Sequence, residues 1–121
     1  MDVGGGSLIL SIVGSRDYPA LDQVTEFVVG LPSGTVIVSG GARGVDRQAV
    51  AAGNAFGFRT HTIPALWNTY GKRAGFIRNQ LLVDTCQMVV AFWDLESRGT
   101  LDTIRKALRA HRPVWVFTQE D

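Results

Sequence analysis

Runs of apolar residues alternate with amphipathic segments along most of this chain. Residues 8–13 and 88–93 are almost entirely apolar, and shorter β-branched or aromatic runs occur at three other places. Such runs are typical of strands that are covered on both faces, as in a parallel sheet. The pattern predicts five strands, over residues 8–13, 35–39, 58–63, 88–93 and 114–117.

Four helices are predicted between these strands, because apolar residues recur there at a spacing of three and four. The first lies between Pro19 and Gly30, and the others cover residues 45–56, residues 73–84 and a segment that follows the loop 94–99. The side chains predicted to face the sheet are Leu21, Val24, Val28, Leu31, Val45, Ala49, Ala52, Phe56, Ala74, Ile77, Leu81, Leu82, Leu101, Ile104 and Leu108.

Strands that alternate with helices imply an α/β fold, a doubly wound parallel sheet of order 3-2-1-4-5 with helices on both faces. The 121 residues are interpreted as one domain (residues 1–121), with residues 1–6 as a flexible N-terminal tail. Right-handed crossovers place every strand-to-helix loop at the same edge of such a sheet. Ligands bind at that edge, where the strand order reverses, so the chemistry of this chain is expected there.

A glycine-rich turn follows the second predicted strand. Gly40, Gly41 and Gly44 lie between Ser39 and the helix that begins near Val45. A strand, a glycine turn and a helix start together direct backbone N–H groups at one place, which suits an anion such as phosphate. The turn is neither a G-x-G-x-x-G fingerprint nor a P-loop. Taken alone, it is equally consistent with a purely structural turn.

The other strand-to-helix loops bring most of the arginines to the same edge, which we interpret as an anion-binding cleft. The candidate ligand-binding residues are Gly14, Ser15, Arg16, Ser39, Gly40, Gly41, Ala42, Arg43, Gly44, Val45, Asp46, Trp67, Tyr70, Arg78, Asn79, Ser97, Arg98, Gly99 and Thr100.

Several of these residues have a second interpretation. Arg16 suits a bidentate phosphate contact, or a surface ion pair with Asp17. Asp46 suits a ribose hydroxyl, or the first turn of its own helix, where an acidic side chain is a cap. Asn79 either contacts the ligand or orients a loop. Ser97 and Thr100 are in any case good residues for a helix start.

Two aromatic residues lie in the segment 64–71, which is predicted to be an irregular loop. Trp67 and Tyr70 there suit stacking on a nucleobase, a contact worth about 1–3 kcal/mol per base. Alternatively they cover the sheet edge or form a subunit contact.

The composition of the chain reduces the number of function classes that fit it. The formal net charge is +1, which gives no overall attraction to nucleic acid or acidic membranes. The single Cys86 cannot form an internal disulfide, and His61 and His111 lack partners at metal-ligand spacing. Neither a bilayer-spanning run nor a basic leader is evident. A cytoplasmic protein with no metal, no required cofactor and no membrane partner is therefore expected.

Four motifs, in this order, carry a resemblance to a known family. They are Gly14-Ser15-Arg16, the stretch from Ser39 to Asp46, the stretch from Ala74 to Asn79, and Ser97-Arg98-Gly99-Thr100. Together they resemble the SLOG superfamily of Rossmann-like nucleotide-binding proteins, most closely its small single-domain YspA/DUF2493-like group. The DNA-processing protein DprA/Smf and the LONELY GUY phosphoribohydrolases are more distantly similar.

This resemblance implies a site for a nucleotide or a nucleotide-derived ligand. It also implies a catalytic role for Arg78, because the phosphoribohydrolases carry a catalytic arginine at the matching position. Their second signature, P-G-G-x-G-T-x-x-E, matches poorly. Its glutamate position is Thr103 here, and Asp102, Asp46 and Glu96 do not occupy the motif position. An oxocarbenium-like transition state needs a nearby carboxylate, so hydrolysis is less well supported than binding.

The sequence therefore favours a module that binds a nucleotide or nucleotide-derived small molecule as sensor or carrier. The alternatives are N-glycosidic hydrolysis of a nucleoside 5′-monophosphate, and DprA-like binding of single-stranded DNA. DNA binding needs a positive groove, which a nearly neutral chain does not promise. A homodimer or higher homo-oligomer is an additional expectation from the resemblance.

Overall fold

Five parallel strands form the centre of the computed structural model, which describes residues 7–119. Their order is β3-β2-β1-β4-β5, so the predicted doubly wound sheet is confirmed. The strand order reverses between β1 and its two neighbours, β2 and β4. The predicted tail at residues 1–6 lies outside the described residues. The strands are β1 Ile9–Gly14, β2 Val36–Ser39, β3 Arg59–Thr62, β4 Met88–Phe92 and β5 Val114–Phe117.

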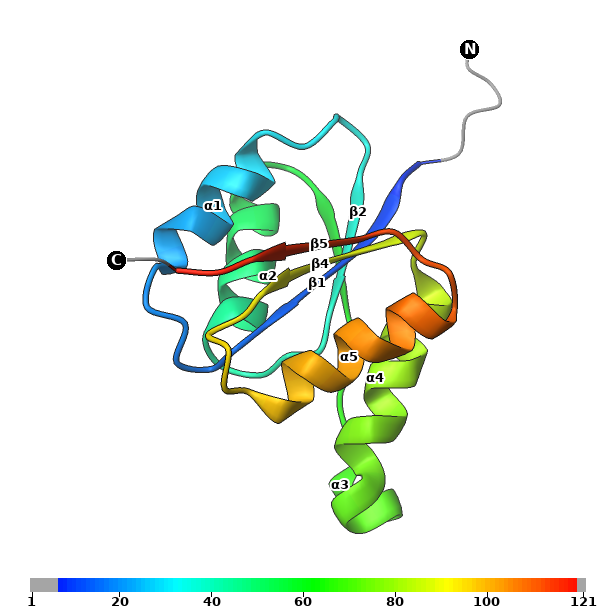
Figure 1. The fold of residues 1–121 in the computed structure, drawn as a ribbon. Coiled ribbons are helices and arrows are strands. Elements are labelled where there is room, and N and C mark those ends of the chain that lie inside the picture. The colour runs from blue at the N-terminus through cyan, green and yellow to red at the C-terminus, as the bar shows by residue number, and fades with distance from the viewer. Residues whose placement is uncertain (1–6, 120–121) are drawn as a thin grey trace.

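Helices cover both faces of the sheet. In Figure 1, α1 (Leu21–Val29) and α2 (Val45–Ala55) lie together on one face, and α4 (Ala74–Thr85) and α5 (Arg98–Arg109) lie together on the other. None of the helices between residues 7 and 119 is both long and apolar enough to cross a membrane.

Side chains of the central strands alternate between two cores, as the period of two in a strand requires. On β1, Leu10 and Ile12 point to the core beneath α1 and α2, whereas Val13 points to the core beneath α4 and α5. The same alternation on β4 sends Phe92 to the first core and Ala91 to the second. Because both faces are buried, the central strands read as continuous apolar runs.

The predicted irregular loop over residues 64–71 is irregular only over residues 64–66, and the prediction was wrong from residue 67 onward. Residues 67–73 form α3 (Trp67–Tyr70) and a 3-10 turn, η1 (Gly71–Arg73), and α3 projects away from the sheet in Figure 1. A helix of four residues is one turn long, which is too short to show a hydrophobic period. Gly71, with φ of 61°, separates it from the next turn.

Three side chains predicted to face the sheet are exposed instead: Phe56 (55 %), Leu81 (47 %) and Leu108 (60 %). Phe56 is the C-cap of α2, where the chain turns back toward β3.

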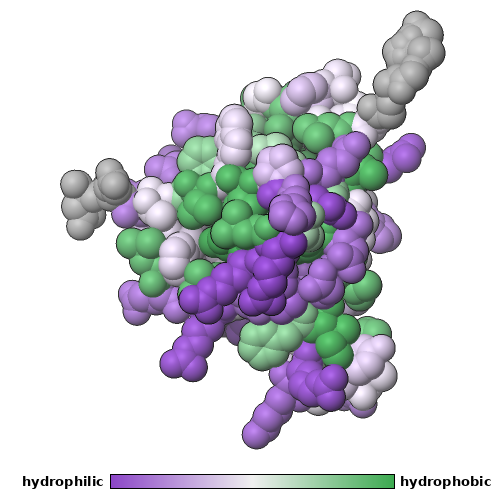
Figure 2. Space-filling view, turned by 45° about the vertical axis from the view of Figure 1, so that its right-hand side comes forward, coloured by the Kyte–Doolittle hydropathy of each residue, from purple (hydrophilic) through white to green (hydrophobic). Residues whose placement is uncertain are grey.

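The buried stripe of α5 includes the polar residues Thr100 and Thr103 beside Ile104 and Ala107. The stripe that hydropathy alone predicted for α5 is therefore shifted by about one residue from the observed stripe. Arg105 and Arg109 are exposed on the same helix. Figure 2 shows a hydrophilic band across the face to which α5 belongs.

The end of β1 packs directly against the start of α2, and Gly14 makes this possible. A Cβ at Gly14 would lie 2.5 Å from the carbonyl oxygen of Phe92 and 2.6 Å from the Cβ of Val45. Both neighbours are buried in the core. The absence of a side chain at Gly14 thus brings the helix start up to the carboxyl end of the sheet.

Gly14→Ala is expected to lower the free energy of unfolding by about 1–3 kcal/mol, because the added methyl group overpacks a rigid contact. Gly99→Ala is the matched control, since a Cβ there has no atom within 4 Å and Gly99 has no positive φ. Its effect should stay within about 0.5 kcal/mol. Urea denaturation of both variants measures the difference, and equal stabilities would contradict the packing argument.

Candidate functional site at the carboxyl edge of the sheet

A cavity of about 790 Å³ opens at the carboxyl edge of the sheet. Its wall comes from the loops after β1, β2 and β4 and from the facing sides of α4 and α5. This volume is within the range of about 300–1,000 Å³ that is usual for small-molecule sites. The polar residues of the wall are Arg16, Asp17, Asp46, Arg78, Asn79, Asp94, Glu96, Ser97, Thr100, Thr103 and Gln119.

A second cavity of about 550 Å³ adjoins the first and shares Arg16, Ala42 and Arg78 with it. Its wall has four arginines, no carboxylate, and the side chain of Trp67. We call it the arginine groove. Its residues are Arg16, Gly40, Gly41, Ala42, Arg43, Arg47, Thr62, Pro64, Ala65, Trp67 and Arg78.

The glycine turn between β2 and α2 forms the wall that the two cavities share. Gly41 and Gly44 have φ of 79° and 82°, a region that L side chains rarely adopt. A Cβ at Gly44 would lie 2.5 Å from the carbonyl oxygen of Arg16. Gly44 therefore allows the loop that carries Arg16 to pack directly on the turn, which places Arg16 beside both cavities.

Arg78 crosses from α4 to this turn. Its Nη1 donates a hydrogen bond of 2.6 Å to the carbonyl oxygen of Gly40, and its Nε donates one of 3.0 Å to Oδ1 of Asn79. A Cβ at Gly40 would lie 2.5 Å from that Nη1 and 2.9 Å from Oδ2 of Asp46. The guanidinium and the Asp46 carboxylate thus converge on the space that glycine leaves open.

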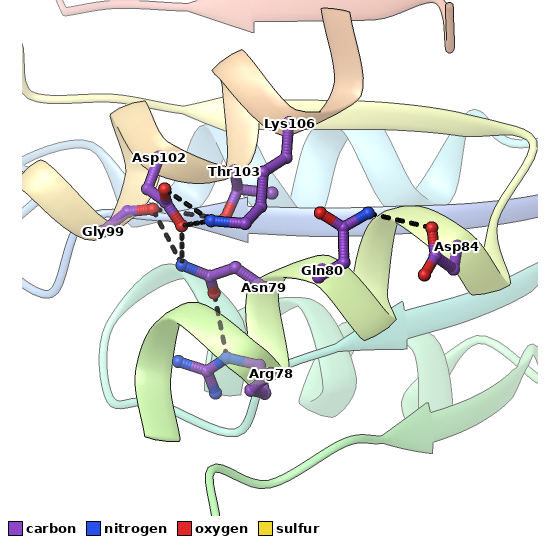
Figure 3. Close-up of polar contacts among 8 residues, drawn as sticks. All are labelled: Arg78, Asn79, Gln80, Asp84, Gly99, Asp102, Thr103 and Lys106. Carbon is purple, nitrogen blue, oxygen red and sulfur yellow. Dashed lines mark hydrogen bonds and ion pairs between the residues drawn. The ribbon is translucent and has the colours of Figure 1, made fainter. Parts of the chain in front are cut away.

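Asn79 connects Arg78 to α5, as Figure 3 shows. Its side-chain Nδ2 donates to the carbonyl oxygen of Gly99 at 3.3 Å and to Oδ2 of Asp102 at 3.0 Å. Lys106 Nζ lies 2.6 Å from both carboxylate oxygens of Asp102. The sequence interpretation of Asn79 as an orienting residue agrees with these contacts, which occupy both N–H donors of its amide and engage its Oδ1.

Arg78 keeps its positive charge without a carboxylate partner. Within residues 7–119 the only ion pair is that of Lys106 and Asp102. Burial lowers the pKa of Arg78, the nearby Asp46 raises it, and Arg16 lowers it again, for a net decrease. A guanidinium stays protonated in proteins, so this decrease means that the charge is held at a cost. An anion in either cavity would offset that cost.

Asp46 is the buried carboxylate of the site, with 4 % of its surface exposed. Its Oδ2 accepts the backbone N–H of Ala42 at 3.2 Å, and its Oδ1 has no hydrogen-bond partner. Burial raises its pKa to about 6, although the backbone N–H groups and Arg78 oppose the rise. The predicted capping role is wrong in detail, because Asp46 binds the turn and makes no cap for α2.

The start of α5 is held by a network of hydroxyl and carboxylate groups. Ser97 is the N-cap, and its Oγ accepts the backbone N–H of Thr100, as predicted for a helix start. Asp94 accepts the N–H groups of Glu96 and Ser97. Burial raises the pKa of Asp94, but these N–H donors together outweigh it and lower the pKa. The hydroxyl of Ser15 accepts the N–H of Asp94, which ties the loop after β1 to this one.

Comparison with known proteins identifies the fold. No protein-family model matches the chain, and no curated protein matches it in sequence. Among solved structures, DNA processing protein A (DprA) from Streptococcus pneumoniae matches with a TM-score of 0.80 and 23 % identity, over 91 % of this chain and 50 % of that one. DprA from Helicobacter pylori, described for its single-stranded DNA binding mode, matches with a TM-score of 0.76 and 24 % identity, over 95 % of this chain and 67 % of that one.

The fold is Rossmann-like and DprA-like. The chain spans about half the length of the pneumococcal protein.

The structure brings most of the predicted site residues to the cavity walls, but not all. The two cavities account for Gly14, Arg16, Gly40, Gly41, Ala42, Arg43, Asp46, Trp67, Arg78, Asn79, Ser97, Gly99 and Thr100. Ser15, Ser39, Gly44, Val45, Tyr70 and Arg98 line neither of them.

These six residues contribute in other ways. Ser39 donates its hydroxyl to the carbonyl oxygen of Ile12 inside the sheet, and Val45 is fully buried in the core. Tyr70 is 46 % exposed on α3. A strand-end position on the correct edge therefore does not ensure that a side chain faces the cleft.

Sequence reasoning did not anticipate Asp17, Asp94 and Thr62 as wall residues, nor Lys106 as the partner of Asp102. Asp94 directly follows the apolar run of residues 88–93, and this position could have identified it as a wall residue. The contact of Lys106 with Asp102 follows an i, i+4 spacing that is visible in the sequence. No group of three His, Cys, Asp or Glu side chains in residues 7–119 is arranged to hold a metal ion.

Asp46→Asn is expected to remove a component of the pH dependence of stability. Because the folded-state pKa is about 6 and the ordinary value is 3.8, the folded protein binds more protons than the unfolded chain between these values. The free energy of unfolding of the wild type therefore falls as pH rises from about 4 to 6. Relative to Asp46→Asn, the fall should be on the order of 3 kcal/mol.

Urea denaturation at pH 4, 5, 6 and 7 measures the stability difference between the two proteins. Glu96→Gln is the control, because Glu96 is an exposed carboxylate on the same cavity. A stability difference between wild type and Asp46→Asn that does not change with pH would show that Asp46 titrates normally.

Proposed function

We propose that this chain binds a nucleotide or a nucleotide-derived small molecule at the carboxyl edge of its sheet. The observation that carries the proposal is Arg78, a half-buried guanidinium that forms no direct ion pair with a carboxylate of residues 7–119 and is part of both cavity walls. A phosphate is the anion that suits a guanidinium with free N–H donors, since the two make short, charge-assisted hydrogen bonds.

The surroundings of Arg78 support a phosphate there. Arg16, Arg43 and Arg47 lie on the wall of the same groove. The glycine turn leads into the N-terminus of α2, where helix dipole and backbone N–H groups favour negative charge. Because the net charge of the chain is only +1, this local concentration of arginines is not a consequence of overall composition.

We propose binding rather than N-glycosidic hydrolysis. The position of the phosphoribohydrolase glutamate is Thr103, whose hydroxyl donates to the carbonyl oxygen of Gly99. The neighbouring Asp102 is already paired with Lys106 and Asn79. Neither residue supplies a free carboxylate for an oxocarbenium-like transition state.

Single-stranded DNA is the second candidate ligand. Four arginines in one groove with no carboxylate, and an exposed tryptophan on its wall, match what a stacked and charged single strand requires. The two similar structures described above are both DprA proteins, and one of them is described by its single-stranded DNA binding mode.

Arg78→Ala is expected to weaken binding of nucleoside 5′-monophosphates by about ten-fold or more, because a charge-assisted contact is lost. Arg105→Ala is the matched control, since Arg105 is an exposed arginine on neither cavity wall. Isothermal titration calorimetry measures affinity, and circular dichroism checks that both variants fold. If the two variants bind equally well, Arg78 is not the phosphate contact.

Trp67→Ala tests the DNA ligand. If the groove binds single-stranded DNA, this change should weaken binding of an oligothymidylate by roughly 5- to 150-fold through lost stacking. The control is Trp115→Ala, because Trp115 on β5 is as exposed (55 %) as Trp67 (54 %) but lies outside the groove. Fluorescence anisotropy at several salt concentrations measures both, with a steep decrease in affinity at high salt expected. No retention at low salt would exclude the DNA ligand.

A further inference from the structure

The two adjoining cavities have opposite chemical character. The arginine groove has four guanidinium groups and no carboxylate on its wall. The larger cavity has two of these arginines, Arg16 and Arg78, but also four carboxylates. A phosphate is attracted to the arginine groove and is repelled by the carboxylates of the larger cavity. The four carboxylates are those of Asp17, Asp46, Asp94 and Glu96.

Asp46 distinguishes this wall from an ordinary acidic surface. It is 4 % exposed, it belongs to the wall of the larger cavity, and its Oδ1 makes no hydrogen bond of normal length with residues 7–119, although the backbone N–H groups of Gly14 and Gly40 interact with the carboxylate. A buried carboxylate oxygen without a donor is costly. Of the other three, Asp94 is engaged by backbone N–H groups, and Asp17 and Glu96 are exposed to solvent. Asp46 is therefore the carboxylate that gains most from a ligand that donates a hydrogen bond.

We propose that the larger cavity holds the hydroxyl-bearing sugar of a ribonucleotide whose phosphate lies against Arg78, with Asp46 accepting a hydrogen bond from a ribose hydroxyl. This inference rests on the proposed nucleotide-binding function and gives the ligand an orientation. Because Asp46 and Arg78 converge on Gly40, one ligand reaches both with its phosphate and its sugar.

The proposal also specifies the class of ligand. A hydroxyl is neutral and donates a hydrogen bond, so it fits a carboxylate that would repel a second phosphate. Internal nucleotides of single-stranded DNA have no 2′-hydroxyl, and their 3′-oxygen is esterified. A free ribonucleotide, or a larger molecule with an unmodified ribose, satisfies Asp46, and a DNA strand does not.

The volumes of the two cavities agree with placing the sugar in the larger cavity and the phosphate beside Arg78. The cavity beside Asp46 is the larger of the two, at about 790 Å³ against about 550 Å³. Hydroxyl groups of Ser97, Thr100 and Thr103 also belong to its wall. A polar wall of hydroxyls and carboxylates suits a sugar better than an apolar base.

The test compares ribonucleoside 5′-monophosphates with their 2′-deoxy, 3′-deoxy and 2′,3′-dideoxy counterparts by calorimetry on the full chain. The wild type should bind the ribonucleotide about ten-fold or more tightly than the dideoxy compound, as expected for a hydrogen bond to a charged group. In Asp46→Asn this ratio should approach one. In the control Glu96→Gln, which removes a carboxylate from the same wall, the ratio should be retained.

Each other outcome overturns the proposal in an identifiable way. Equal binding of ribo- and dideoxynucleotides by the wild type rejects the sugar contact but leaves nucleotide binding intact. A ratio that persists in folded Asp46→Asn assigns the hydroxyl to another residue. A ratio lost equally in both variants indicates a general charge effect. Absence of binding by every monophosphate rejects the proposed function as well. The wild-type comparison needs no variant, so it still tests the sugar contact if Asp46→Asn does not fold.

Discussion

The hydrogen bond from Arg78 to the carbonyl oxygen of Gly40 joins the two halves of the site. It connects α4, on one face of the sheet, with the glycine turn that leads into α2, on the other. The guanidinium fits because Gly40 has no side chain, and the same space receives the carboxylate of Asp46. Both cavities depend on this contact, since Arg78 belongs to both walls. Desolvation of the Arg78 charge is the physical basis for the anion binding that we propose.

The residues around Arg78 position its guanidinium without neutralising its charge. Asn79 accepts from the guanidinium through a neutral amide, and the formal charge of Asp102 is balanced by Lys106. If the residue beside Arg78 were a carboxylate, the two would form an internal ion pair and weaken the attraction for an external anion. The amide fixes the orientation of the guanidinium and leaves its charge available for a ligand.

The sequence was sufficient for the fold because the fold follows from local patterns. Continuous apolar runs marked the strands, and the alternation of strands with helices required a parallel sheet with its loops on one edge. The glycine turn and Arg78 were found for the same reason. Side-chain direction was not predictable in this way. Ser39 and Val45 are in the predicted stretch, but one bonds within the sheet and the other fills the core.

The features that sequence reasoning missed arise from tertiary contacts. The stripe of α5 contains Thr100 and Thr103, which are buried because the start of that helix lies against the cleft, not because they are apolar. The unsatisfied oxygen of Asp46 depends on how closely the glycine turn approaches it. The distance between the glycine turn and Asp46 cannot be read from the pattern of residue types. Prediction from sequence fails for buried polar groups, and these groups lie at the cleft.

Shared fold and distinct chemistry are compatible in this chain. A doubly wound sheet places loops from several strands around one space whatever their sequence, so likeness to DprA concerns the fold and does not determine which ligand is bound. Identity is determined by the side chains that these loops carry. Here a groove of arginines continues into a cavity whose buried carboxylate, Asp46, has one oxygen without a hydrogen-bond partner among the described residues. A uniform polyanion would use only the groove, whereas a ligand with a phosphate at one end and hydroxyl groups at the other would use both.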